Sequence, residues 1–256
     1  VAIILLGGHL VANMSMQVGD LIAFMTYATQ IMISFMMLSM IFVFVPRASA
    51  SATRVNAVLD QPISIHNAPE KDQEKISINQ PASLEFKNVD FRFHGAERLA
   101  LHDLNFKVTA GQTLAIIGGT GSGKSALVNL IPRLFDIESG EIKVDGVPVK
   151  KLSQHNLHEV ISITQQQAVL FSGTIRSNLQ FGYEEATNKE MWHALEIAQA
   201  ADFVREEGGL DAVVEQNGSN FSGGQRQRLA IARTIIKPAS IYVFDDSFSA
   251  LDFETD

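Results

Sequence analysis

Hydrophobic side chains are concentrated at the beginning of the chain. Leu21–Val45 is a run of 25 residues without a charged side chain, which exceeds the ~20 residues that a helix needs to cross a bilayer. Val1–Ala12 is also apolar but shorter, and the polar stretch Asn13–Asp20 separates the two runs. The pattern predicts a membrane span preceded by the end of another helix. A buried helix of a large soluble protein is the alternative, although charge-free runs of this length are rare there.

Arginine residues follow this span, and none precedes it. Arg47 and Arg54 lie just beyond Val45, whereas the polar break before the span has no Lys or Arg. By the positive-inside rule, the Val45 end faces the cytoplasm. The helical spacing of Pro46–Asp60 predicts that the helix continues into the cytoplasm. We therefore expect a multi-pass protein of the cell membrane, in which further membrane helices precede this sequence.

Methionine is unevenly distributed, since seven of the eight methionines lie within the first 45 residues. Met side chains adapt to irregular shapes and would suit a path for varied substrates. Contact with lipid or with neighbouring helices is the commoner use of such side chains. The sequence is compatible with both interpretations.

The pattern becomes that of a soluble α/β domain after residue 83. Apolar runs predict strands at residues 83–93, 100–108, 113–118, 161–164 and 241–244, and a hairpin at 140–149. The runs at 113–118 and 241–244 are continuous, which is typical of strands buried on both faces. Helices are predicted from residue 124 and at 190–201 and 224–236. The chain thus divides into a membrane part with its cytoplasmic extension (1–60), a linker with three prolines (61–83) and a globular domain (84–256).

Composition narrows the function. The net charge of the 256 residues is −8, which argues against a nucleic-acid partner. The chain has no cysteine, which excludes a disulfide framework and a zinc site built from thiolates.

A glycine-rich stretch follows the predicted strand at 113–118. The sequence GGTGSGKS, Gly118–Ser125, fits the phosphate-binding pattern G-x-x-x-x-G-K-[ST] between a strand and a helix. Its backbone N–H groups would surround the phosphates of ATP, Lys124 would reach the β- and γ-phosphates, and the Ser125 hydroxyl would bind Mg²⁺. A glycine-rich turn without a ligand is the alternative. The expected cradle consists of Gly118, Gly119, Thr120, Gly121, Ser122, Gly123, Lys124, Ser125 and Ala126.

A second apolar strand ends in two carboxylates. In the sequence IYVFDD, Asp245 directly follows the strand and is expected to lie beside the Mg²⁺. Such a strand end is a weak signal alone. Together with the glycine-rich loop it predicts a complete nucleotide site.

The sequence NFSGGQRQRLAIARTI, residues 220–235, resembles the signature of ATP-binding cassette (ABC) proteins. The resemblance implies an α/β P-loop NTPase cassette with a mixed core sheet, a helical signature subdomain and an antiparallel β edge, here preceded by transmembrane helices. It also implies that two cassettes pair head to tail, so that each signature acts in trans on the other's γ-phosphate. The matching signature residues are Ser222, Gly223, Gly224 and Gln225.

The same resemblance assigns further positions. Phe93 matches the aromatic residue that stacks on adenine, although it could instead be a core residue of its strand. Gln166 matches the glutamine that binds the metal, and its neighbours Gln165 and Gln167 leave the register open by one residue. Ser249–Asp252 matches the loop that crosses between the two sites.

Three departures from the family pattern stand out. Asp246 replaces the glutamate that positions the attacking water. Gln216 occupies the place where exporters commonly have a glutamate that touches the membrane domain, and the adjacent Glu215 is a possible substitute. None of the seven histidines follows the crossing loop, so we expect the family's histidine switch beyond Asp256.

These features predict the ATP-binding subunit of an ABC exporter, an ATPase that requires ATP and Mg²⁺. Because Asp246 is shorter than glutamate, the chain's own ATP site is expected to hydrolyse ATP slowly. The resemblance is to the degenerate subunit of heterodimeric bacterial multidrug exporters. The partner would then be a second half-transporter that carries the glutamate, and the exported molecule a small molecule, lipid or peptide. A homodimeric exporter or lipid flippase with an active site is the alternative. A soluble cassette ATPase of DNA repair or translation is disfavoured by Leu21–Val45.

Overall fold

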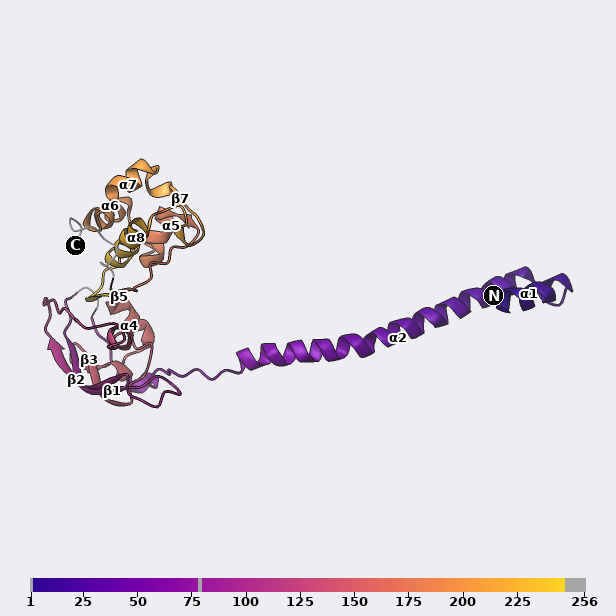
Figure 1. Cartoon of the computed structure of the whole chain (residues 1–256), viewed down its shortest axis with the longest axis horizontal. Coiled ribbons are helices and arrows are strands. Elements are labelled where there is room, and N and C mark those ends of the chain that lie inside the picture. Colours follow the sequence, from indigo (N-terminus) through magenta and orange to yellow (C-terminus); the bar gives the residue numbers. More distant parts are fainter. Residues whose placement is uncertain (1, 78–79, 247–256) are drawn as a thin grey trace. The chain divides into compact units, whose positions relative to one another are not determined.

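The computed structural model describes residues 2–77 and 80–246. It divides into two compact units, Val1–Ser64 and Ile65–Asp256. Figure 1 shows the first unit as a helical pair and the second as a mixed α/β body.

The first unit consists of two helices, α1 (Ala2–Ala12) and α2 (Val18–Leu59). The Gln17 backbone N–H donates to Asp20 Oδ2 (3.3 Å), which satisfies a donor at the start of α2. The helix then runs for 42 residues and continues through Pro46. It is the one described helix long and apolar enough to cross a membrane, as the uncharged run predicts.

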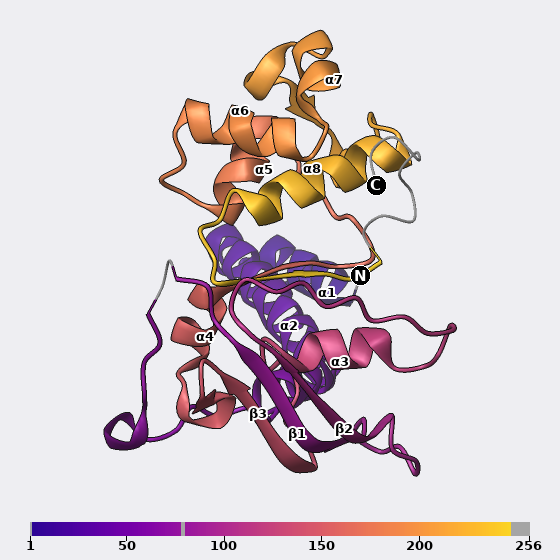
Figure 2. The ribbon, with the colours of Figure 1, turned by 90° about the vertical axis from the view of Figure 1, so that its left-hand side faces the viewer.

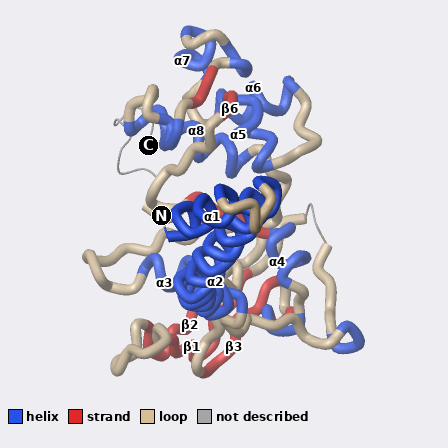
Figure 3. Tube along the Cα trace, turned by 90° about the vertical axis from the view of Figure 1, so that its right-hand side faces the viewer, coloured by secondary structure: helices blue, strands red, loops and turns tan. Residues whose placement is uncertain are grey.

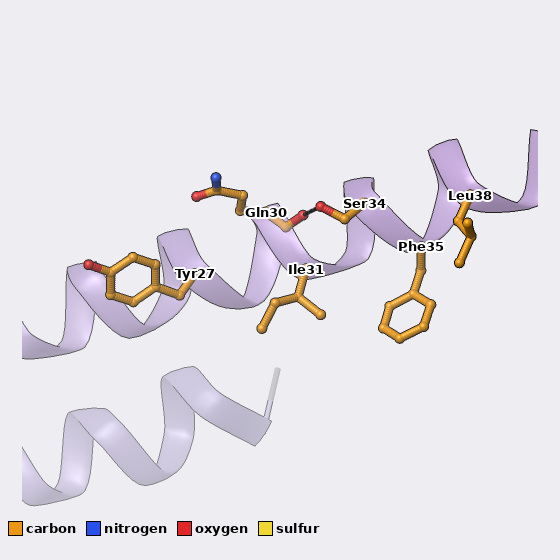
Figure 4. Close-up of a pocket in the computed structure, with 6 residues that line it drawn as sticks. All are labelled: Tyr27, Gln30, Ile31, Ser34, Phe35 and Leu38. Carbon is orange, nitrogen blue, oxygen red and sulfur yellow. Dashed lines mark hydrogen bonds between the residues drawn. The ribbon is translucent and has the colours of Figure 1, made fainter.

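The side chains of α2 suit an apolar surrounding. Four hydroxyl groups of α2 each donate to the carbonyl oxygen four residues earlier, at 2.8–2.9 Å, so no hydroxyl among them needs an outside partner. One of these bonds, from Ser34 to the Gln30 carbonyl, is drawn in Figure 4. The groove shown there is lined by Tyr27, Gln30, Ile31, Ser34, Phe35 and Leu38.

An antiparallel sheet forms one lobe of the second unit. Its strand order is β2-β1-β3-β4, with bounds β1 Leu84–Phe91, β2 Leu101–Val108, β3 Ser139–Val144 and β4 Val147–Pro148. The predicted hairpin is confirmed, because Asp145 and Gly146 both have positive φ (49° and 78°), as a tight two-residue turn requires. Helices α3 (Lys124–Leu130) and α4 (Gln154–Val160) pack on this lobe with the short η2 (Val149–Lys151), and the core contains Phe86, Val89, Leu130, Val144 and Leu157.

A parallel pair of strands joins this lobe, β5 (Ile161–Thr164) and β8 (Ile241–Phe244). The prediction of a third buried strand at residues 113–118 is wrong in this structure. That segment has no strand pairing among the described residues, and Ile117 is 94% exposed. Its apolar composition favours a central strand, but only ladder hydrogen bonds to neighbouring strands can fix one in place. A cavity of about 1040 Å³ lies between the segment and β8.

The second lobe is helical (Figures 2 and 3). It consists of α5 (Ile175–Gly182), α6 (Asn188–Ile197), α7 (Ala201–Glu206), α8 (Gly223–Ile235), the short η3 (Gly209–Asp211) and η4 (Gln216–Gly218), and the strand pair β6 (Gly173–Thr174) and β7 (Val213–Val214). The continuous helix predicted at 190–201 is wrong, because Gln199 takes a positive φ of 52° between α6 and α7. Helix α8 packs against α5, α6 and β5 and so links the helical lobe to the parallel strands.

The proline-containing stretch 61–83 includes η1 (Glu70–Asp72) and belongs in part to the second unit. Ile76 is buried in the sheet lobe, and its backbone N–H donates to Asn156 Oδ1 (3.0 Å). The His66 carbonyl accepts a hydrogen bond from Arg133 Nη2 (3.1 Å). Residues 65–76 are therefore held against the sheet lobe by specific contacts.

Candidate functional site

The glycine-rich loop leads directly into α3. Gly121 and Gly123 have φ values of 81° and 94°, a region that glycine enters without steric cost. A side chain at Gly123 would collide with Leu101, whose Cδ2 would lie 2.7 Å from the added Cβ. The close approach of this loop to β2 thus requires glycine at position 123.

Lys124 folds back over the loop. Its Nζ atom donates to the Gly118 carbonyl (2.6 Å) and to the Gly119 carbonyl (3.0 Å). The positive charge therefore sits at the mouth of the loop, where a phosphate would have to approach. Ser125 is exposed, whereas Ala126 is buried and fixes the first turn of α3 in the core. The rest of the predicted cradle, from Gly118 to Ser122, is exposed.

Phe93 lies near the loop. Phe91 pairs with Leu101 across β1 and β2, and Leu101 is the side chain that Gly123 approaches. Two residues after Phe91, Phe93 is 43% exposed, and it meets Phe91 edge to face at 4.8 Å. An exposed ring beside the phosphate loop is what a stacking contact with a base needs.

The strand end that carries Phe91 is held by a charged residue. Asp90 accepts hydrogen bonds from the Asp103 backbone N–H (2.8 Å), Ser139 Oγ (2.7 Å) and His102 Nδ1 (2.8 Å). These bonds, that from Asp103 most strongly, lower the pKa of Asp90 to about 2. Asp90 therefore stays ionised and ties β1, β2 and β3 together behind the aromatic side chains.

The structure brings Gln166 and Asp246 together. Gln166 Nε2 donates to Asp246 Oδ2 at 3.1 Å, although the residues lie 80 positions apart. Asp246 has a φ of 48°, which Asp tolerates better than most residues. Asp245, Asp246 and Lys124 all line the cavity beside β8. The strand end and the glycine-rich loop, 120 residues apart in the sequence, thus face one space.

The signature residues form the start of α8. Ser222 Oγ accepts a hydrogen bond from the Gln225 backbone N–H (3.2 Å), and Gln225 Oε1 accepts one from the Ser222 backbone N–H (2.8 Å). This reciprocal capping box leaves the Ser222 O–H group able to donate. Gly223 is exposed, and a Cβ added there would meet nothing within 4 Å, so a phosphate could approach the helix end closely.

The two candidates for the membrane contact differ. Both residues are exposed, but Glu215 accepts a hydrogen bond from Ser219 Oγ (2.9 Å), whereas Gln216 is the first residue of η4. The crossing loop Ser249–Asp252 lies outside the described residues.

The donor set can be tested for Mg²⁺ by its chemistry. Among the described residues, no group of three or more His, Cys, Asp or Glu side chains could hold a metal ion. Mg²⁺ keeps several waters and binds few protein oxygens beside substrate phosphates, so a sparse site is suitable. The hydroxyl of Ser125, the amide oxygen of Gln166 and the carboxylate of Asp245 are oxygens of the kind this ion prefers.

The sequence did not indicate the role of one further aromatic residue, Phe135. It lies 5.6 Å from Phe93, ring centre to ring centre, and is 40% exposed. Phe135 lies among other apolar residues after α3, such as Leu134 and Ile137, so its sequence context does not single it out.

Comparison with known proteins identifies the family. Residues 101–249 match the ABC transporter family. An uncharacterized ABC transporter ATP-binding protein of Mycobacterium bovis is 43% identical over 260 residues, which cover 100% of this chain and 44% of that protein. The ATP-dependent lipid A-core flippase of Haemophilus influenzae is 40% identical over 82% of this chain and 35% of its own length.

A solved structure agrees with this assignment. The structure of a bacterial Atm1-family ABC exporter with ATP bound has a TM-score of 0.78 and 35% identity, and covers 94% of this chain and 42% of that chain. The chain thus spans less than half the length of these relatives. The apolar helix α2 and the exporter relatives agree with the predicted membrane protein with a cytoplasmic cassette. The match over more than half of the sequence shows that the chain belongs to the ABC transporter family.

Proposed function

We propose that this chain is the ATP-binding subunit of an ABC exporter whose own ATP site hydrolyses slowly. The contact between Gln166 and Asp246 carries the proposal. Ser125, Gln166 and Asp245 would hold the Mg²⁺, which when bound would offset charge on the phosphates. Asp246 occupies the position from which a carboxylate would orient the attacking water.

The length of Asp246 supports the slow site. A carboxylate one methylene shorter than glutamate is withdrawn by about 1 Å, and a misplacement of that size can lower a rate on the order of 10²-fold. Its bond to Gln166 also engages one oxygen of the carboxylate. ATP binding should persist, because Lys124 and the glycine-rich loop carry it.

The intact signature supports a division of labour between two chains. Ser222 and Gln225 form a complete cap at the exposed start of α8, which suits a contact to the γ-phosphate of a partner cassette. A chain with a slow site and a complete signature fits a heterodimer whose partner supplies the glutamate. Closure of the cassette pair on ATP would then drive alternating access of the membrane helices.

A test of the slow site is the steady-state ATPase rate of the full-length chain purified alone in lipid nanodiscs. Asp246→Glu should raise the rate by roughly tenfold or more if reach limits hydrolysis. Asp246→Asn keeps the size and the tolerance of positive φ but removes the charge, and should leave an already slow rate nearly unchanged. Equal rates for the wild type and Asp246→Glu, with a loss in Asp246→Asn, would contradict the proposal.

A second candidate is a homodimeric exporter or lipid flippase with active sites. The similarity to lipid A-core flippases favours it, and it makes lipids one of the candidate cargoes besides small molecules and peptides. Full ATPase activity of the purified chain without a partner, lost in Asp246→Asn, would support this candidate instead.

A further inference from the structure

Phe135 stands beside the ring that is proposed to contact the base. The Phe93 and Phe135 rings lie 5.6 Å apart with an angle of 85° between their planes. Phe91 supports both, at 4.8 Å from Phe93 and 5.6 Å from Phe135. Phe91 is only 1% exposed, whereas Phe93 and Phe135 are 43% and 40% exposed. The cluster therefore has one buried anchor and two rings open to solvent.

The loop that carries Phe135 is fixed from both sides. On one side, Arg133 Nε donates to Asp136 Oδ1 (2.8 Å), and the Arg133 side chain is only 6% exposed. On the other side, Arg92 pairs with both carboxylate oxygens of Glu138 at 3.0 Å. A bidentate pair of this kind restricts orientation as well as distance. Phe135 is therefore held in place by the ion pairs around it.

We propose that Phe135 is a positioning residue for nucleotide bases, which braces Phe93 so that its exposed face can stack on a purine. This inference rests on the proposed nucleotide function of Phe93. Phe93 meets both neighbouring rings nearly at right angles (76° and 85°), an arrangement that favours one ring orientation. Without Phe135, the Phe93 ring has support from Phe91 alone. Stacking on a base would then require ordering of the ring during binding.

The effect should depend on the base and not on the phosphates. Phosphate contacts are expected from Lys124 and the glycine-rich loop, whereas the ring of Phe135 contacts the rings of Phe91 and Phe93. Loss of the Phe135 ring should therefore weaken the binding of ATP. Inorganic tripolyphosphate, which has no base, should bind as before. A general disturbance of the loop that carries Phe135 would instead weaken the binding of both ligands alike.

The experiment compares the affinities of the full-length chain in nanodiscs for MgATP and for magnesium tripolyphosphate, the latter by competition. Phe135→Leu, which keeps an apolar side chain but loses the ring, should weaken MgATP about two- to tenfold and leave tripolyphosphate unchanged. Phe135→Tyr retains the ring and should bind MgATP like the wild type. Leu134→Ala is a matched control, since Leu134 is 41% exposed in the same loop, and should change neither affinity.

Phe93→Ala separates this inference from the proposed function. This variant should lower the affinity for MgATP by about five- to a hundredfold, because the stacking contact is lost. If Phe93→Ala leaves MgATP binding unchanged, the proposed base contact fails and the inference fails with it. If Phe93→Ala weakens MgATP but Phe135→Leu does not, or Phe135→Leu weakens both ligands equally, only the inference is overturned.

Discussion

The start of α8 and the glycine-rich loop are both glycine-containing helix starts that we propose to contact phosphate, yet the structure forms them to different degrees. At α8, Ser222 and Gln225 satisfy each other and leave the helix end open. At the loop, Lys124 donates to the Gly118 and Gly119 carbonyls, and the preceding segment pairs with no described strand.

The difference shows which interactions each element depends on. The cap of α8 joins residues three positions apart, so the local sequence is sufficient to form it. The loop needs a strand before it, and that strand needs neighbours from distant parts of the chain. The cap of α8 is thus complete from local contacts, whereas the glycine-rich loop depends on non-local strand pairing.

The largest expected effect comes from Lys124. Lys124→Ala should weaken MgATP about 10- to 100-fold, because a hydrogen bond to a charged group is lost. Lys237→Ala is the matched control, since Lys237 Nζ also donates to backbone carbonyls, those of His158 and Ile161, which lie outside the glycine-rich loop. Equilibrium binding should separate the two variants. Equal affinities of both for MgATP would show that Lys124 does not serve the phosphates.

Gly123→Ala should destabilise the sheet lobe by about 1–3 kcal/mol, because φ is 94° and the added methyl group meets Leu101. Gly119→Ala adds a methyl group where nothing lies within 4 Å, so its effect on stability should be small. Hydrogen exchange of the β1–β2 peptides compares the two. A similar loss of protection in both would mean that close packing does not explain Gly123.

Ser222→Ala should cost about 1 kcal/mol through the lost cap. Thr187 forms the same kind of capping box with Glu190 at the start of α6, so Thr187→Ala should cost a similar amount. Unfolding followed by the fluorescence of Trp192, the one tryptophan of the chain, measures both. ATPase activity of the complete transporter should fall only in Ser222→Ala. A matching fall in Thr187→Ala would assign the effect to stability alone.

The smallest expected effect is on the stability of the fold at acidic pH. The pKa of Asp90 is lowered from 3.8 to about 2, so its ionised form stabilises the fold above about pH 4, and this contribution is lost as the pH falls through about 2. Asp90→Asn removes it. Between pH 4 and 2 the wild type should therefore lose protection of β1 more steeply than Asp90→Asn, as hydrogen exchange compared at equal pH would show. Parallel profiles would contradict this assignment.

Elements specified by short-range patterns were predictable from the sequence. The Asp145–Gly146 turn and helix α8 follow from turn chemistry and helical spacing. The prediction of a buried strand at 113–118 was wrong, because strand pairing depends on partners that are distant in the sequence. The contact between the Ile76 backbone and Asn156 was also not predictable, because a stretch with three prolines gives no periodic signal.

The residues of the candidate site also fall into two groups, those that short motifs predict and those that only the folded chain reveals. The positions of Lys124 and Asp245 followed from motifs, and both line the cavity beside β8. The bond between Gln166 and Asp246 required the folded chain, because three adjacent glutamines are equivalent in the sequence. Phe135 was not identified, because its role depends on ring geometry and not on spacing.

In the proposed division of labour, this chain contributes its signature to the partner's site but hydrolyses little ATP at its own. The most direct measurement is the steady-state ATPase rate of the transporter purified from cells with its partner subunit, carrying either Asp246→Asn or Ser222→Ala in this chain. We expect a rate within about twofold of the wild type for Asp246→Asn and a loss of roughly tenfold or more for Ser222→Ala. Loss of activity in Asp246→Asn, with activity retained in Ser222→Ala, would contradict it.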